Sequence, residues 1–171
     1  MAPKKARIVT KRVPSGEDYG TFHREEFGTF TLTEVTGEVA RFRADGLLDY
    51  VQDADHNRVT LSYTSGRLVQ LTHSNGATLT IAYNAAGHIS SIIDSAGRIA
   101  TYGYDQTNNY LLSVNTVAGT TTYAYNTTAA AAQLGTLASV SDDTGVTQSF
   151  EYDDQGRLLD TFIHRRQSPD V

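Results

Sequence analysis

The chain has 171 residues, a hydrophobic fraction of 39%, no cysteine and a formal net charge of −5. This composition excludes a disordered chain, and without cysteine neither a disulfide framework nor a thiolate zinc site can be built. No apolar run approaches the roughly 18 residues that span a bilayer, and the acidic balance argues against nucleic acid as the main partner.

The chain begins with a basic segment, "MAPKKARIVTKR". A secretory signal would place an apolar stretch behind these charges, and none follows. We therefore expect residues 1–27 to form a basic N-terminal arm and entry segment, either solvated or beginning a strand. At the other end, we expect residues 167–171 to form a short C-terminal tail.

Between these ends, residues 28–166 repeat one pattern with a period of about 20 residues. The stretch "FTLTEVTGEVARF" is followed by units that begin at Gly46, Gly66, Gly87, Tyr110, Gly135 and Gly156. Each unit has two apolar segments separated by a turn, which is typical of a β-hairpin. The sequence therefore predicts an all-β array of about a dozen short strands in consecutive antiparallel hairpins, with contacts mainly between neighbouring units.

The two segments of a unit differ in their periodicity. In the second segment apolar residues alternate, as in Val59, Leu61 and Tyr63, and this is typical of a half-buried strand. In the first segment they are three apart, as in Leu68 and Leu71. Such a pair does not share a face of a regular strand, so we expect a bulge or sharp twist. A ladder of aromatic residues is expected at equivalent positions: Tyr63, Tyr83, Tyr104, Tyr125 and Tyr152.

The turns are rich in Asp, Asn, Ser and Gly, as in "HSNGA", "DSAGR" and "DDQGR". These residues bond their own backbone or tolerate a positive φ. Asp153 is therefore interpreted as a turn former before a catalytic group, and Gly66, Gly87 and Gly156 are expected to adopt positive φ. Residues 127–134, "TTAAAAQL", favour a helix and predict a loop insertion or a single helical turn.

The recurring pattern of Tyr-Asp, a short gap and Gly-Arg-Leu, clear in "EYDDQGRLLD", resembles the RHS/YD-repeat family. The resemblance extends over about residues 28 to 163. It implies a continuous strip of hairpins that curves and spirals into a hollow shell around a toxin or other cargo, and a secreted or cell-surface location. The chain offers too few hairpins to close such a shell and lacks the family's self-cleaving motif. We therefore expect a curved piece of shell wall without autoprotease activity.

Asp53, Asp55 and Asn57 in "DADHN" alternate as the first oxygen ligands of a calcium loop do. The rest of the EF-hand pattern is missing, since Arg58 and Thr64 stand where the loop needs Gly and Glu. A calcium site at these three residues and a plain hairpin turn both remain open.

The histidines form no short metal-binding motif. His56 and His73 fall in turns of successive units, where they could approach each other, while His23, His88 and His164 lie elsewhere. Exposed turn residues are the expected reading, and no catalytic residue is assigned.

Three functions follow from these observations. The favoured one is a structural or interaction module, a piece of shell wall whose partners are a cargo polypeptide or a second copy, held by edge strands and the concave face. The second is a small hydrolase, assisted by calcium, that acts on an amphiphilic ester or lactone in an apolar groove. The third is a carbohydrate-binding surface on which the tyrosines stack, although the same tyrosines are expected to serve as a buried core.

Overall fold

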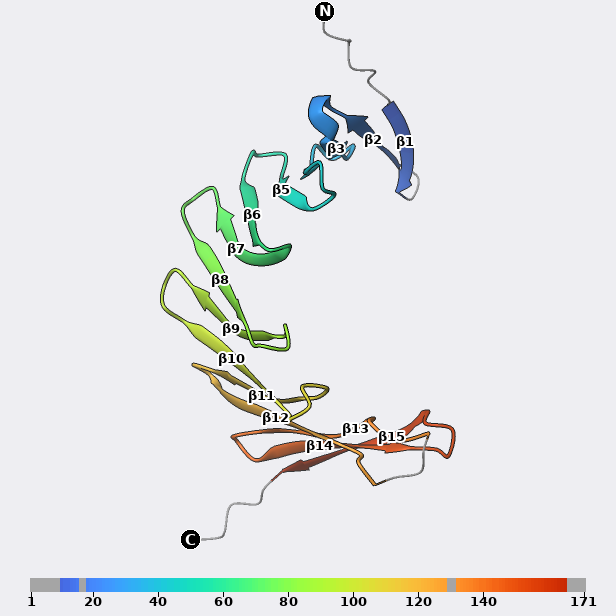
Figure 1. Ribbon diagram of the computed structural model, residues 1–171. Helices are drawn as coiled ribbons and strands as arrows, with labels where there is room; N and C mark the ends of the chain where they lie inside the picture. The colour runs from blue at the N-terminus through green and yellow to red at the C-terminus, as the bar shows by residue number, and fades with distance from the viewer. Residues whose placement is uncertain (1–9, 16–17, 129–131, 166–171) are drawn as a thin grey trace, which may run out of the picture. The chain divides into compact units, whose positions relative to one another are not determined.

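The structure is a computed structural model that describes residues 10–15, 18–128 and 132–165 (Figure 1). These residues form fifteen strands and one short 3₁₀ helix, η1 (Glu26–Gly28). The strands are β1 (Thr10–Ser15), β2 (Asp18–Arg24), β3 (Phe30–Thr33), β4 (Val39–Phe42), β5 (Leu48–Gln52), β6 (Arg58–Thr64), β7 (Arg67–His73), β8 (Thr78–Tyr83), β9 (Ile89–Asp94), β10 (Ile99–Tyr104), β11 (Leu111–Thr116), β12 (Gly119–Tyr125), β13 (Leu137–Asp142), β14 (Val146–Tyr152) and β15 (Leu158–Arg165).

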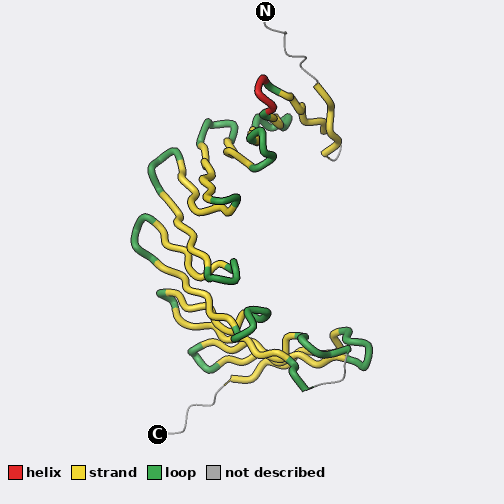
Figure 2. Tube along the Cα trace, in the orientation of Figure 1, coloured by secondary structure: helices red, strands yellow, loops and turns green. Residues whose placement is uncertain are grey.

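The strands are hydrogen-bonded in the order in which they occur in the sequence, from β1 to β15, and the pairing is antiparallel. Figure 2 shows the resulting alternation of strand and turn along the chain. This confirms the predicted all-β array of consecutive hairpins. The strands exceed a dozen because residues 10–24, within the expected arm, supply β1 and β2. Two compact units are present, residues 1–80 and 81–171, and β8 contains the boundary.

Most of the turns share one hydrogen-bond pattern. The N–H of Asp153 donates to the carbonyl of Arg157, and the N–H of Gly156 donates to the carbonyl of Asp153. Gly156 has a φ of 77°, so the turn is a type I turn followed by a left-handed residue. Gly66 at 77° and Gly87 at 91° also have the positive φ that was predicted. In the described part of residues 127–134 the backbone forms turns and bends, without a helical turn.

A bulge follows the turn that joins one unit to the next. Tyr63 pairs with Leu68, but Ser62 pairs with Gln70, so Val69 is an extra residue in β7. A bulge brings residues three apart onto one face, which confirms the irregularity predicted from the spacing of the leucines. The same shift recurs at four other pairs, Phe42 with Leu48, Tyr104 with Leu111, Tyr125 with Leu137 and Tyr152 with Leu158. The aromatic residues therefore occupy equivalent positions.

The bulges sort the side chains onto two faces of different chemistry. In the first unit the apolar face carries Phe30, Phe42, Leu48, Tyr63, Leu61, Leu71 and Leu79. The opposite, polar face carries Thr31, Arg41, Tyr50, Thr60, Thr72 and Thr78. In the second unit Tyr102, Val114 and Tyr123 lie on one face, and Ser113, Thr122, Ser141 and Thr147 lie on the other.

Neither face is deeply covered. Among the described residues Ile81, 8% exposed, is the one buried hydrophobic side chain. The tyrosines of the ladder are half-buried, so they are more exposed than a buried core would make them. The last strand, β15, is exposed throughout, with Ile163 at 68%. A single layer of sheet cannot enclose its side chains, so cross-strand pairs and turns contribute much of its stability.

Candidate functional site

The aspartates of the Tyr-Asp pairs are engaged within their own turns. Asp153 Oδ1 accepts the N–H groups of Gln155 and Arg157, each at 2.9 Å, and Oδ2 accepts Nε–H of Arg157 at 2.7 Å. The backbone hydrogen bond from Arg157 is the main reason that the pKa of Asp153 is lowered. The carboxylate therefore forms the turn, as predicted, and holds no proton to donate at neutral pH.

Asp105 shows the same arrangement more strongly. Its Oδ1 accepts the N–H groups of Asn109 at 2.7 Å and Tyr110 at 2.8 Å, and its Oδ2 accepts the hydroxyl of Thr107. The Thr107 hydroxyl is the largest of the influences that lower the pKa of Asp105 to about 2. The Tyr-Asp signature of the sequence is thus a turn-forming device at both positions.

The residues predicted as a calcium site lie in the turn between β5 and β6. Asp53 Oδ1 accepts the N–H of Asn57 at 2.9 Å, and Oδ2 accepts Nδ2–H of Asn57 at 2.8 Å. The side-chain bond from Asn57 is the main cause of the lowered pKa of Asp53, and Asp55 is exposed beside it. Calcium would have to replace both bonds from Asn57, so the site stays a prediction. It requires a calcium-dependent rise in melting temperature that Asp53→Asn abolishes.

The histidines make local contacts. His56 Nδ1 lies 3.1 Å from Nε2 of Gln52, and His73 Nδ1 accepts the N–H of Asn75 at 3.1 Å. The ring of His88 packs on Tyr104, with 5.0 Å between centroids. His23 lies in β2 and His164 is exposed in β15. Across the described ranges, no group of three or more His, Asp or Glu side chains could hold a metal ion.

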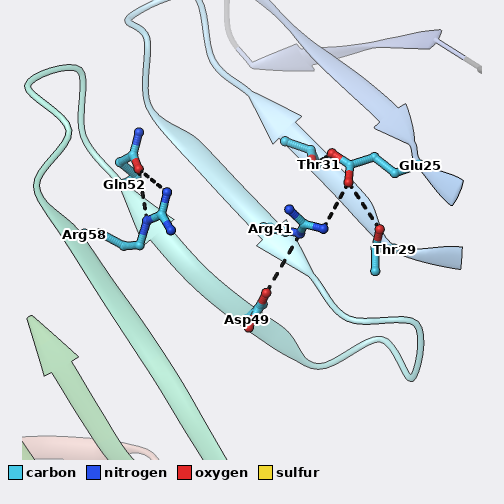
Figure 3. Close-up of polar contacts among 7 residues, drawn as sticks. All are labelled: Glu25, Thr29, Thr31, Arg41, Asp49, Gln52 and Arg58. Carbon is cyan, nitrogen blue, oxygen red and sulfur yellow. Dashed lines mark hydrogen bonds and ion pairs between the residues drawn. The ribbon is translucent and has the colours of Figure 1, made fainter. Parts of the chain in front are cut away.

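The structure shows a charged network on the polar face that was not predicted from the sequence (Figure 3). Glu25 Oε1 accepts the hydroxyl of Thr31 at 2.7 Å, and Oε2 accepts that of Thr29 at 3.3 Å. The Thr31 bond is the main influence that lowers the pKa of Glu25. Arg41 lies between two carboxylates, 3.1 Å from Oε2 of Glu25 and 3.8 Å from Oδ2 of Asp49. The network ties β3, β4 and β5 together.

A second arginine holds the next pair of strands. Nε and a terminal nitrogen of Arg58 donate to Oε1 of Gln52 at 3.0 and 2.6 Å (Figure 3). Its guanidinium carbon lies 3.9 Å from the centroid of the Tyr50 ring, a cation–π distance. Arg41 and Arg58 each stand at an alternating strand position in the sequence. Which residues they contact depends on the strand register, which the sequence does not show. Both networks connect neighbouring strands of the sheet.

The first groove lies on the apolar face of the first unit and has a volume of about 410 Å³. Its floor is a continuous row of register partners, Leu32, Ala40, Val51, Val59 and His73. Its rim is formed by turn residues, among them Glu34, Glu38, Asp53 and Asn57. Asp53, Asn57 and His73 line this groove, but Asp55, which is exposed in the same turn, is not among its lining residues. The convergence of both aspartates with a histidine that the hydrolase prediction needs is therefore not seen in this groove.

The second groove belongs to the second unit and is lined by aromatic residues. Tyr102, Tyr104, Tyr125 and His88 contribute to a hollow of about 700 Å³, together with Ile89, Leu111 and Asn109. The hydroxyl of Tyr104 donates to the carbonyl of Ile89 at 2.9 Å. Tyr125 packs against Tyr110 with 4.7 Å between ring centroids, and burial is the main cause of its raised pKa. The rings are thus held in place at an open surface.

Consecutive antiparallel hairpins, Tyr-Asp turns and an aromatic residue before each bulge define a YD-repeat β-sheet protein. The family model of the Teneurin YD-shell matches residues 34–168. The chain therefore belongs to the Teneurin YD-shell family, which confirms the resemblance seen in the repeated motif. No helix in the described parts of the chain is long and apolar enough to cross a membrane.

Several individual proteins are similar to parts of this chain. It is 39% identical over 110 residues to the tRNA3(Ser)-specific nuclease WapA of Bacillus spizizenii, a match that covers 59% of the chain and 4% of the nuclease. The fold is also similar to a chain of the Photorhabdus luminescens Tc holotoxin pore, with a TM-score of 0.62, 17% identity and coverage of 86% of this chain and 9% of that one. A chain of the TcdB2-TccC3-Cdc42 complex gives a TM-score of 0.62 with 17% identity and covers 87% and 9%. The chain thus spans less than a tenth of each of these relatives.

Proposed function

We propose that the chain is a section of shell wall that holds a cargo polypeptide against its apolar face. The observation that carries the proposal is the separation of the two faces. Leucines and aromatic residues are half-exposed on one face, while threonines and paired arginines occupy the other. An exposed apolar surface of this kind marks a place that another molecule covers. The likeness to the nuclease WapA and to the Tc holotoxin supports a setting in toxin-related proteins.

The proposal predicts binding of an unfolded polypeptide to the full chain. Fluorescence anisotropy with labelled, reduced and carboxymethylated α-lactalbumin measures this, and folded α-lactalbumin is the reference. Leu61→Lys places a charge on the apolar face and should weaken binding by roughly tenfold, which corresponds to about 1.4 kcal/mol. Thr60→Lys, the neighbouring residue on the polar face, is the matched control. Equal binding by both variants, or none by the parent chain, contradicts the proposal.

The exposed edge of β15 gives this wall a second kind of partner. Leu158, Leu159 and Ile163 are 55%, 66% and 68% exposed. An edge strand that bears such side chains accepts a further strand by β-augmentation. A second copy or a following hairpin would serve. Sedimentation velocity of the full chain should show self-association that Ile163→Lys reduces, whereas a strict monomer at high micromolar concentration would count against pairing between copies.

A carbohydrate-binding role is supported separately by the second groove. Tyrosine rings held at an open surface are suited to stacking on the apolar faces of sugars. Asn109 and His88, which also line the groove, could bond sugar hydroxyls. A glycan array probed with the full chain tests this role. Tyr102→Ala should remove any binding seen, and a signal that survives this variant would place the sugar elsewhere.

A further inference from the structure

The second groove crosses the strands of the second unit instead of following one of them. Its lining residues lie on β9, β10, β11 and β12 or in the turns that precede β9 and β11. Three strand spacings give the groove a length of roughly 14 Å. Tyr104 and Tyr125 occupy equivalent positions on β10 and β12, and Leu111 of β11 lies between them. Aromatic rings therefore recur along the groove at two strand spacings, or about 9.6 Å.

The groove also contains hydrogen-bond donors that the chain leaves unused. The hydroxyl of Tyr104 donates to a carbonyl of its own hairpin. The hydroxyl of Tyr125 makes no hydrogen bond within the described ranges, and its ring packs on Tyr110. The hydroxyl of Tyr102 and the side-chain amide of Asn109 likewise have no partner among the described residues. Three donors beside the rings are thus open to a ligand.

The lining of the groove contains no carboxylate and no Lys or Arg among the described residues. Asp105, in the turn that precedes β11, already accepts the N–H groups of Asn109 and Tyr110. The loop that follows β12, with the sequence "TTAAAAQL", contains no ionisable side chain. The part of a ligand that meets this groove is therefore expected to be uncharged.

Ring spacing, free donors and the lack of charge together fit a polypeptide in the polyproline II conformation. That helix has three residues per turn and a rise of about 3.1 Å per residue, so it repeats at a distance close to the spacing of the rings. Its carbonyls have no internal hydrogen bonds and can accept from hydroxyl and amide donors. Proline-rich segments dock in aromatic-lined grooves, and their preformed conformation lowers the entropy cost of binding. A single sugar ring would cover only part of this groove.

We propose that the second groove binds a proline-rich polypeptide segment in the polyproline II conformation. The inference rests on the proposed shell-wall function, and it gives the cargo a chemical class and a place of contact. Proline rings pack against Tyr104 and Tyr125, while Tyr102 and Asn109 donate to carbonyls of the segment. Because no ion pair is formed, binding is nearly independent of salt.

The test uses the full chain and labelled hexaproline, with binding followed by fluorescence anisotropy. Hexaproline should bind roughly tenfold more tightly than a glycine–serine peptide of equal length. The glycine–serine peptide is also uncharged, but it is flexible and has no rings to pack on the tyrosines. The affinity for hexaproline should stay nearly constant as the salt concentration is raised.

Two substitutions locate the ligand in the groove. Tyr125→Phe removes one free hydroxyl and keeps the ring, so it should weaken hexaproline binding by roughly fivefold. Tyr123→Phe is its matched control, because Tyr123 lies on the same strand and is not among the lining residues. Tyr102→Ala should weaken binding by roughly tenfold, with Thr101→Ala as its control. If Tyr102→Ala fails to fold, the two phenylalanine variants decide the question.

The outcomes separate the groove from the wall. Equal affinity for hexaproline and the glycine–serine peptide overturns the proposal, and so do groove variants that bind like their controls. Sugar binding that needs Tyr102, together with hexaproline binding that does not, would assign the groove to carbohydrate and also overturn the proposal. If unfolded α-lactalbumin still binds and Leu61→Lys weakens it, the shell-wall function stands without a proline-rich ligand. If the parent chain binds no unfolded polypeptide, the shell-wall function itself fails.

Discussion

Tyr104→Phe tests whether the aromatic ladder is held by hydrogen bonds as well as by contact. The hydroxyl of Tyr104 donates to the carbonyl of Ile89 at 2.9 Å, and Tyr152 makes the equivalent bond to Leu137 at 2.9 Å. Each bond runs from the last residue of a hairpin to the first residue of the same hairpin, fifteen residues earlier. The substitution removes the hydroxyl and keeps the ring that packs on His88. A net hydrogen bond of this kind contributes about 0.5–1.5 kcal/mol to the free energy of unfolding.

The measurement is equilibrium urea unfolding followed by circular dichroism. Tyr102→Phe is the matched control, because Tyr102 lies on the same strand and face but its hydroxyl makes no hydrogen bond within the described residues. We expect Tyr104→Phe to lower the unfolding free energy by about 1 kcal/mol and Tyr102→Phe to change it by less than about 0.5 kcal/mol. Equal effects would refute the claim that the hydroxyl, rather than the ring, joins the two ends of the β9–β10 hairpin.

Three further predictions concern the turns and the ladder. The pKa of Asp105 is lowered from 3.8 to about 2, so its contribution to stability is present above pH ~4 and is lost as the pH falls toward ~2; Asp105→Asn should flatten this part of an acid-unfolding curve. Gly87 has a φ of 91°, so Gly87→Val should cost about 1–3 kcal/mol in urea unfolding and more than Gly87→Asn, and equal losses would argue against strain. Tyr83 is half-buried, so Tyr83→Ala should cost about 2 kcal/mol rather than the 3–5 kcal/mol of a fully buried aromatic residue. A loss below about 1 kcal/mol would mark the ladder as a binding surface.

Features that depend on a few consecutive residues, such as turns and bulges, could be predicted from the sequence. The turn at Asp153 and Gly156 is formed by hydrogen bonds and dihedral angles within five residues. The amino-acid sequence of those residues is therefore enough to predict the turn. The spacing of Leu68 and Leu71 indicated the bulge, because side-chain direction follows directly from the strand period.

Features that depend on register or on covering layers could not be predicted. Glu25, Arg41 and Asp49 come from separate segments, and their meeting requires the pairing of three strands. The partial exposure of the Tyr83 side chain could not be predicted either. Alternation of apolar residues indicates which side chains share a face of the sheet, but it does not indicate what covers that face. The first groove depends on both, since its floor is a cross-strand row and its rim comes from two turns.

The direct succession of strands from β1 to β15 has a consequence for how such proteins change over evolutionary time. Each hairpin meets chiefly the strands before and after it, and no central core has to be rebuilt when one hairpin is gained or lost. Gly66 and Gly87 stand at the same point of successive units, so a duplication or deletion between them preserves the turn, the bulge and the identity of each face. Unequal recombination can therefore alter the number of hairpins in a gene while the encoded chain keeps one continuous order of antiparallel strands.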